Sequence, residues 1–137
     1  MEILERKCVK GAYRKLEAMK NPALMEFVAK YADLCNPDSI LVSTDSKADE
    51  VLMKKMSVEK REEIPLDIEG HTIHFDGIND QGRDPKNTKF LFEKGIAPEG
   101  LNGIDRDDGL NEVHHKMKDI MKGRQMIVWF YALGPVG

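Results

Sequence analysis

The sequence predicts an α/β fold, a mixed β-sheet with flanking helices, on three observations. Early in the chain a helical pattern, a strand pattern and another helical pattern follow one another. The strand, at 39–44, has an apolar centre and β-branched residues, as expected of a strand that is buried on both faces. A second apolar run, at 126–133, is long enough to form a central strand.

Two helices are expected before the first strand. Residues 2–18 place apolar side chains at near-helical spacing, with charged side chains on the opposite face. The second helix should begin at Pro22, because Asn21 suits the N-cap and proline suits the first helical position. It should end at Asn36-Pro37, which does not continue a helix.

The middle of the chain predicts one further helix and three short strands. Ser46, with Asp49 three residues later, resembles a capping box that begins a helix. The segment 64–66 suits either an edge strand or an extended connection. Residues 71–75 and 88–92 read as strands, and the loop between them is rich in Gly, Asn and Asp.

The last third of the chain begins with turn signals, since 93–106 contain three glycines and a proline. A long helix is then expected over 107–122, with Asp107 as its N-cap and Gly123 as its C′ residue. The run at 126–133 should be a fully buried central strand. Such a strand needs neighbours on both edges, so we expect partner strands beyond residue 137.

Composition excludes several classes of protein. The chain has 137 residues, enough for one domain with a modest core, and a net charge of −3 gives no electrostatic case for binding nucleic acid or an anionic membrane. The N-terminus is acidic where a signal peptide would be basic, and no apolar run reaches membrane-spanning length. Cys8 and Cys35 fit two reduced thiols in a cytosolic protein, with a disulfide as the alternative.

Metal-binding patterns are incomplete in this sequence. His71 and His74 lie three apart on an expected strand, so their side chains point to opposite faces. His114 and His115 are adjacent on an expected helix, about 100° apart, which is equally poor for one shared ion. Residues 104–109 resemble a calcium loop, but glycine comes at position five instead of six.

Phosphate-binding and catalytic motifs are also missing from the sequence. It contains no Gly-Lys dipeptide for a phosphate loop and no Gly-x-Gly-x-x-Gly. We therefore assign no catalytic, cofactor-binding or metal-binding residue within the chain.

Arg83 is the one candidate binding residue. It lies between Gly82 and Asp84-Pro85, so turn-forming backbone flanks a planar cation that never loses its charge. A guanidinium fork in such a loop suits the binding of an anion. The alternative is a surface arginine paired with Asp84 or Asp80.

Four stretches resemble the N-terminal domain of GTP-dependent phosphoenolpyruvate carboxykinase, especially that of its archaeal members. They are residues 23–38, 70–77, 80–84 and 121–137. The most specific part is Met-Lys-Gly-Arg-x-Met, followed by an apolar strand and Gly-Pro-Val-Gly. The likeness extends from about residue 21 to the end of the chain.

This resemblance implies that residues 1–137 form a single N-terminal, substrate-side domain, and that the nucleotide- and metal-binding C-terminal part is absent from the chain. The family is a group of carboxy-lyases that convert oxaloacetate and GTP to phosphoenolpyruvate, GDP and CO2 with Mn2+ or Mg2+. Its members are cytosolic or mitochondrial and serve gluconeogenesis or anaplerosis, and the cytoplasm is expected for this chain. Arg83 matches the family's arginine that grips the substrate carboxylate. The partners implied are the substrate and the missing C-terminal part, and the isolated chain is expected to be inactive.

Two alternatives stay open at this level. Lys86 and Lys89 either add positive potential beside Arg83 or are solvated surface lysines. The chain itself could instead be a non-enzymatic truncated module, which binds small carboxylates or oligomerises through an exposed C-terminal strand.

Overall fold

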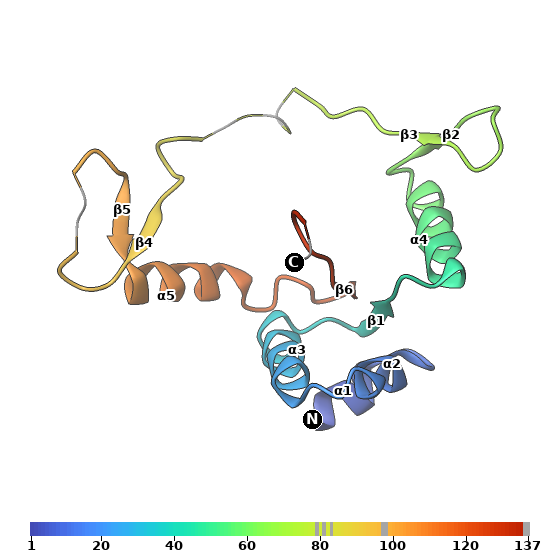
Figure 1. Ribbon diagram of the computed structural model, residues 1–137, viewed down its shortest axis with the longest axis horizontal. Coiled ribbons are helices and arrows are strands. Elements are labelled where there is room, and N and C mark those ends of the chain that lie inside the picture. Colours follow the sequence, from blue (N-terminus) through green and yellow to red (C-terminus); the bar gives the residue numbers. More distant parts are fainter. Residues whose placement is uncertain (79, 81, 83, 97–98, 136–137) are drawn as a thin grey trace.

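The computed structural model describes residues 1–78, 80, 82, 84–96 and 99–135. The chain begins with three helices, and strands are then interspersed with two further helices (Figure 1). In order, the elements are α1 (Glu2–Lys7), α2 (Ala12–Ala18), α3 (Pro22–Cys35), β1 (Ser39–Ser43), α4 (Lys47–Glu59), β2 (Ile64–Pro65), β3 (Thr72–Ile73), β4 (Phe90–Phe92), β5 (Gly103–Asp105), α5 (Arg106–Met117) and β6 (Gln125–Trp129).

Strand pairing is both parallel and antiparallel, which agrees with the predicted α/β class. Among the described residues it is divided over three two-stranded sheets. β1–β6 and β4–β5 are parallel, whereas β2–β3 is antiparallel. The β4–β5 and β2–β3 sheets consist of strands only two or three residues long.

The core forms around β1, as the apolar run at 39–44 predicted. Ile40 and Val42 are fully buried, and the helices α1, α2 and α3 supply most of the side chains around them. The buried apolar residues of this cluster are Leu4, Ala12, Leu16, Val28, Ala32, Cys35, Ile40, Val42 and Met126. Cys8 and Cys35 are free thiols at this core, and burial raises the pKa of each.

The predicted helix over 2–18 is wrong, because the segment is two helices. The chain leaves α1 at Cys8, which forms a parallel bridge with Ile40, and the Val9 N–H donates to the Ile40 carbonyl at 2.9 Å. Gly11 then turns the chain into α2 with a φ of 88°, a conformation that glycine adopts without strain. Pairing with the central strand therefore overrides the helical periodicity.

The predicted start of α3 is confirmed. The Asn21 side chain accepts the Leu24 N–H at 3.1 Å, and Pro22 is the first helical residue. Ser46 likewise caps α4 by accepting the Asp49 N–H at 3.2 Å. The capping box is not reciprocal, however, since the Asp49 carboxylate binds Lys15 and Thr44 instead.

The predicted boundaries of α5 are wrong at both ends. Its N-cap is Asp105, not Asp107. The three residues before the helix form β5, a strand that was not predicted because the glycines and proline of 93–106 indicated turns. The helix ends at Met117, and a turn through Asp119 (φ 57°) replaces the expected last helical residues. Gly123 is therefore not a C′ residue of α5.

β6 is shorter and more exposed than the predicted central strand. It runs beside β1 in the register Ile40↔Met126 and Val42↔Val128. Met126 is buried, but Ile127 is 40% exposed and Trp129 65% exposed. Within the described part of the chain β1 is its one partner strand, which is why complete burial is not observed.

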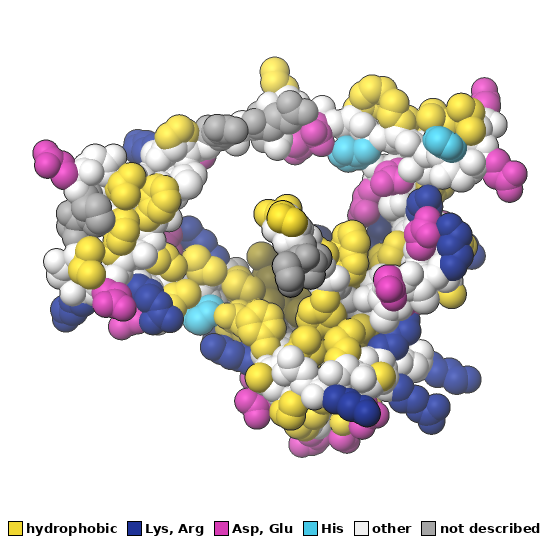
Figure 2. All heavy atoms as spheres, viewed as in Figure 1, with side chains coloured by type: hydrophobic (Ala, Val, Ile, Leu, Met, Phe, Trp, Pro, Cys, Tyr) yellow, Lys and Arg dark blue, Asp and Glu magenta, His cyan; other side chains and the backbone are white. Residues whose placement is uncertain are grey.

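The elements follow a wide arc around the C-terminal segment (Figures 1 and 2). α4 leads away from the core to the β2–β3 hairpin, and the long connection after β3 crosses to β4 and β5. α5 leads back from β4 and β5 to α3, where the Tyr31 and His114 rings lie 5.9 Å apart. The long connection after β3 therefore joins the β2–β3 hairpin to the β4–β5 sheet.

Candidate functional site

The connection between β3 and β4, residues 74–89, is called the β3–β4 loop here. It contains Arg83, the predicted binding residue, which lies outside the described residues together with Asn79 and Gln81. The site is therefore built from the described residues before and after Arg83. These residues form three local structures, each held by side chains of the loop or its neighbours.

His74 fixes the start of the β3–β4 loop. Its Nδ1 lies 2.6 Å from the Glu62 carbonyl oxygen, beyond the end of α4, and its Nε2 lies 3.1 Å from Asp76 Oδ1. Both partners are acceptors, so the geometry suits an imidazolium with two N–H donors. The Glu62 carbonyl, and to a smaller extent Asp76, raises the pKa of His74.

A tight turn follows at Gly77. The Gly77 N–H donates to Asp80 Oδ2 at 2.6 Å, and the Asp80 N–H donates back to the Gly77 carbonyl at 3.0 Å. One of the two carboxylates considered as partners of Arg83 is therefore engaged with backbone.

Asp84 begins a single helical turn immediately after Arg83. Its Oδ1 accepts the Asn87 N–H at 3.1 Å, and its carbonyl accepts the Thr88 N–H at 2.8 Å. This is how an N-cap residue acts, and Pro85 occupies the first helical position, where its missing N–H is not needed. The Asn87 side-chain amide, 2.6 Å from Asp84 Oδ2, contributes most to a lowered pKa of Asp84.

Asn102 holds the far side of this turn, and sequence reasoning did not find it. Its side-chain nitrogen lies within 3.2 Å of three carbonyl oxygens, those of Pro85, Lys86 and Thr88. No motif marks such contacts, because they join positions 14 to 17 residues apart.

The lysines of the loop are exposed. The charge of Lys89 helps to lower the pKa of Glu112 on α5, after the larger effect of Lys116, whose ammonium lies 2.6 Å from Glu112 Oε1. Lys89 therefore interacts electrostatically with an acidic residue, Glu112.

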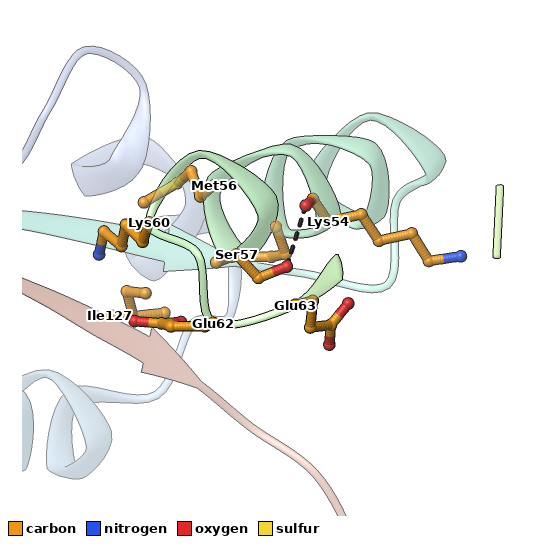
Figure 3. A pocket seen from close by; sticks show the side chains of 8 residues that line it. Lys54, Met56, Ser57, Lys60, Glu62, Glu63 and Ile127 are labelled. Atoms are coloured by element: carbon orange, nitrogen blue, oxygen red, sulfur yellow. Dashed lines mark hydrogen bonds between the residues drawn. The ribbon is translucent and has the colours of Figure 1, made fainter. Parts of the chain in front are cut away.

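Two hollows lie on α4 and β6, away from the helical turn at Asp84. The smaller one, about 240 Å³, is lined by residues of opposite charge, and Ile127 of β6 reaches it from the side opposite α4 (Figure 3). The larger one, about 510 Å³, lies at the carboxyl ends of β1 and β6. Its wall consists of Ser43, Thr44, Asp45, Glu50, Met53, Lys54, Ile127, Trp129 and Phe130.

One histidine of each pair, His74 and His114, contacts other residues of the chain. His74 binds Glu62 and Asp76 as described, and His114 Nε2 lies 3.4 Å from the Tyr31 hydroxyl. In the described ranges, no three His, Cys, Asp or Glu side chains gather where they could share an ion. None of the helices in these ranges is long and apolar enough to cross a membrane.

The fold defines an α/β protein in which a long loop, with Arg83 in its sequence, connects the β2–β3 hairpin to β4, β5 and α5. Residues 26–137 match the model of the phosphoenolpyruvate carboxykinase N-terminal domain, and the chain belongs to this family. It is 46% identical to the phosphoenolpyruvate carboxykinase [GTP] of Thermococcus sibiricus over 90% of its length. The corresponding enzyme of Pyrococcus abyssi is 41% identical over 98% of the chain.

The Sulfurisphaera tokodaii enzyme is 43% identical over 89% of the chain. In these comparisons the chain spans 20–22% of the length of the relatives. The resemblance stated from the sequence is thus confirmed, for about a fifth of the relatives' length.

Proposed function

We propose that this chain is the N-terminal, substrate-side portion of a GTP-dependent phosphoenolpyruvate carboxykinase, and that residues 1–137 act as one domain. Such an enzyme converts oxaloacetate and GTP to phosphoenolpyruvate, GDP and CO2. The observation that carries the proposal is the family match, which includes Arg83 and the helical turn directly after it. The cytoplasm is the compartment that we propose for it.

Arg83 is the residue that binds the substrate carboxylate in this proposal. Oxaloacetate and phosphoenolpyruvate are small anions, and a guanidinium can donate two parallel hydrogen bonds to a carboxylate. Its role is positioning, because holding the substrate in one orientation removes much of the entropic part of the barrier. Asp84 follows Arg83 directly in the sequence, and its carboxylate accepts the N–H and the side-chain amide of Asn87.

GTP and Mn2+ or Mg2+ belong to the C-terminal part of the enzyme in this proposal. The described residues offer no cluster of metal ligands, and the sequence has no Gly-Lys phosphate loop. We therefore expect the isolated chain to have no carboxykinase activity. A coupled assay that detects GTP-dependent phosphoenolpyruvate formation by the isolated chain would refute this assignment.

The role of Arg83 is tested in a chimera in which this chain replaces the matching fifth of the Thermococcus sibiricus enzyme. Arg83→Ala should raise KM for oxaloacetate by about 10- to 100-fold, since a charge-assisted contact is worth about 1.5–3 kcal/mol. KM for GTP should stay within about twofold. Lys94→Ala, which removes a cation elsewhere in the chain, is the matched control, and a comparable loss of GTP affinity in Arg83→Ala would contradict the role.

A second candidate function is a non-enzymatic module that oligomerises through β6. The exposure of Ile127 and Trp129 favours it, because an apolar strand face seldom stays open to water. Sedimentation velocity from about 5 to 500 μM distinguishes the two candidates. A concentration-dependent dimer that Trp129→Lys abolishes would favour the module, whereas a monomer at all concentrations would argue against it.

A further inference from the structure

The helical turn after Arg83 needs hydrogen-bond donors for the carbonyl groups at its C-terminal end. A helix leaves its last carbonyl groups without partners, and one turn is too short to bind them within itself. Here the carbonyls of Pro85, Lys86 and Thr88 all face one donor group, the side-chain amide of Asn102, at 3.2, 3.0 and 2.9 Å. Asn102 thus acts as a C-terminal cap supplied by a distant segment.

Asn102 is itself fixed in place by backbone contacts. Its carbonyl accepts the Phe90 N–H at 2.8 Å, and the next residue, Gly103, pairs with Phe90 in the β4–β5 ladder. This ladder is closely packed, because a Cβ added at Gly103 would lie 2.7 Å from the ring of Phe92. Because Asn102 is anchored on the β4–β5 ladder, its side-chain amide holds the Asp84–Thr88 turn in one place.

The same unit is joined to α5. Gly109 is buried in that helix, and a Cβ added there would lie 2.4 Å from Leu91 Cδ2 and 3.1 Å from Ile104 Cγ2. α5 therefore sits directly on β4 and β5. The turn that begins at Asp84 is connected through Asn102 to a helix and two strands, not only to its own loop.

We propose that Asn102 is a positioning residue for substrate binding: by capping the Asp84–Thr88 turn, it fixes the backbone that directly follows Arg83 in the sequence. Asp84 secures the start of the turn and Asn102 secures its end. This inference rests on the proposed function, because it gives the turn a purpose only if Arg83 binds a carboxylate. It adds that the affinity for the anion depends on an amide donor that does not touch the ligand.

The test uses the 15N-labelled chain with oxalate as the probe. Oxalate is a small dicarboxylate that resembles one carboxylate end of oxaloacetate. Asn102→Asp keeps the shape of the side chain but replaces the N–H donors by a carboxylate facing three carbonyls. We expect oxalate to bind about tenfold more weakly and the Thr88 amide to exchange its hydrogen at least tenfold faster. The same substitution at Asn111, on the surface of α5, is the matched control and should change neither value.

Asn102→Gln separates positioning from general stability. It keeps both N–H donors, so it should recover most of the oxalate affinity. The thermal midpoints of Asn102→Asp, Asn102→Gln and Asn111→Asp should agree within about 3 °C. Equal oxalate affinity in the wild-type and Asn102→Asp chains would overturn the positioning role alone. If the wild-type chain does not bind oxalate, the carboxylate role of the loop fails and the positioning role fails with it, whereas the Thr88 exchange rates still report whether Asn102 caps the turn.

Discussion

At the scale of single residues, Asp49 is a strongly constrained ionisable group. It is 6% exposed, and its two carboxylate oxygens lie 2.5 and 2.7 Å from the Lys15 ammonium. Thr44 adds its N–H at 2.9 Å and its hydroxyl at 2.5 Å. The Lys15 contact, followed by the Thr44 hydroxyl, holds the pKa of Asp49 far below its usual range. This group joins α2, β1 and α4 at one point.

Asp49→Asn should lower the free energy of unfolding at pH 7 by about 2 kcal/mol, because it leaves the Lys15 charge without its partner. Since the folded pKa is depressed, the stabilisation is present above the unfolded pKa of about 3.9 and is lost as the pH falls below it. Urea midpoints at pH 7 and pH 3 measure both effects. The wild-type chain should lose more stability than Asp49→Asn over this interval, with Asp45→Asn, an exposed neighbour, behaving as wild type.

His74 is the second residue whose ionisation matters. Its folded pKa is raised from the ordinary value of 6.5, chiefly by the Glu62 carbonyl, so its contribution is complete below that pH. It is lost as the pH rises through the folded pKa, since a neutral imidazole can donate to only one of its two acceptors. Among the described residues, the carboxylates of Asp76 and Glu63 also raise this pKa.

NMR titration of the His74 ring should give a pKa above 6.5 in the wild-type chain. Asp76→Asn removes one of the charges that favour the imidazolium, so it should lower this pKa without returning it fully to the ordinary value. Glu99→Gln, which removes a carboxylate far along the chain, is the control. A wild-type pKa below 6.5 would show that the contacts of His74 do not hold it in the charged form.

At the scale of elements, the start of α5 distinguishes two nearby aspartates, the half-buried Asp105 and the exposed Asp107. Asp105 accepts the N–H groups of Asp107 and Asp108 at 2.9 and 3.3 Å, whereas the Asp107 carboxylate lies 3.8 Å from the exposed Arg106. Asp105→Ala should therefore cost about 1 kcal/mol of stability, the usual cost of losing an N-cap, and Asp107→Ala less than about 0.5 kcal/mol. Urea denaturation compares the two variants, and an equal cost would show that α5 begins later than Asp105.

The elements also show which parts of the fold local sequence can predict. The cap at Asn21 and the buried strand β1 depend on neighbouring residues and on one uninterrupted apolar run, and both are as predicted. The break between α1 and α2 depends instead on the pairing of Cys8 with Ile40, 32 positions away, which no local pattern contains. β5 was missed for a similar reason, because its glycine suggested a turn while its partner β4 lies across a loop.

The candidate site shows the same division. Sequence alone could select Arg83, because charge, flanking turn residues and a family resemblance are all local features. It could not select Asn102, whose contacts with residues 85–88 exist only once β4 and β5 have paired. Arg83 remains a prediction, since it lies outside the described residues.

At the scale of the whole molecule, much apolar surface is open. Trp129, Tyr131 and Leu133 are 65%, 74% and 97% exposed, and Trp129 also lines the hollow of about 510 Å³. The curated relatives are about five times as long as this chain. These exposures fit the proposal that the chain acts as one portion of a larger enzyme, with its C-terminal strand covered by further protein.

The central claim is that this chain already contains half of a carboxylate site, carried by Arg83. The most direct test is a two-dimensional amide NMR titration of the wild-type and Arg83→Ala chains with phosphoenolpyruvate. We predict dispersed spectra, with shifts centred on Gly82, Arg83 and Asp84 in the wild-type chain and no such shifts in the variant. Dispersed spectra with the same shifts in both chains would contradict the claim, because the anion would then bind without the arginine.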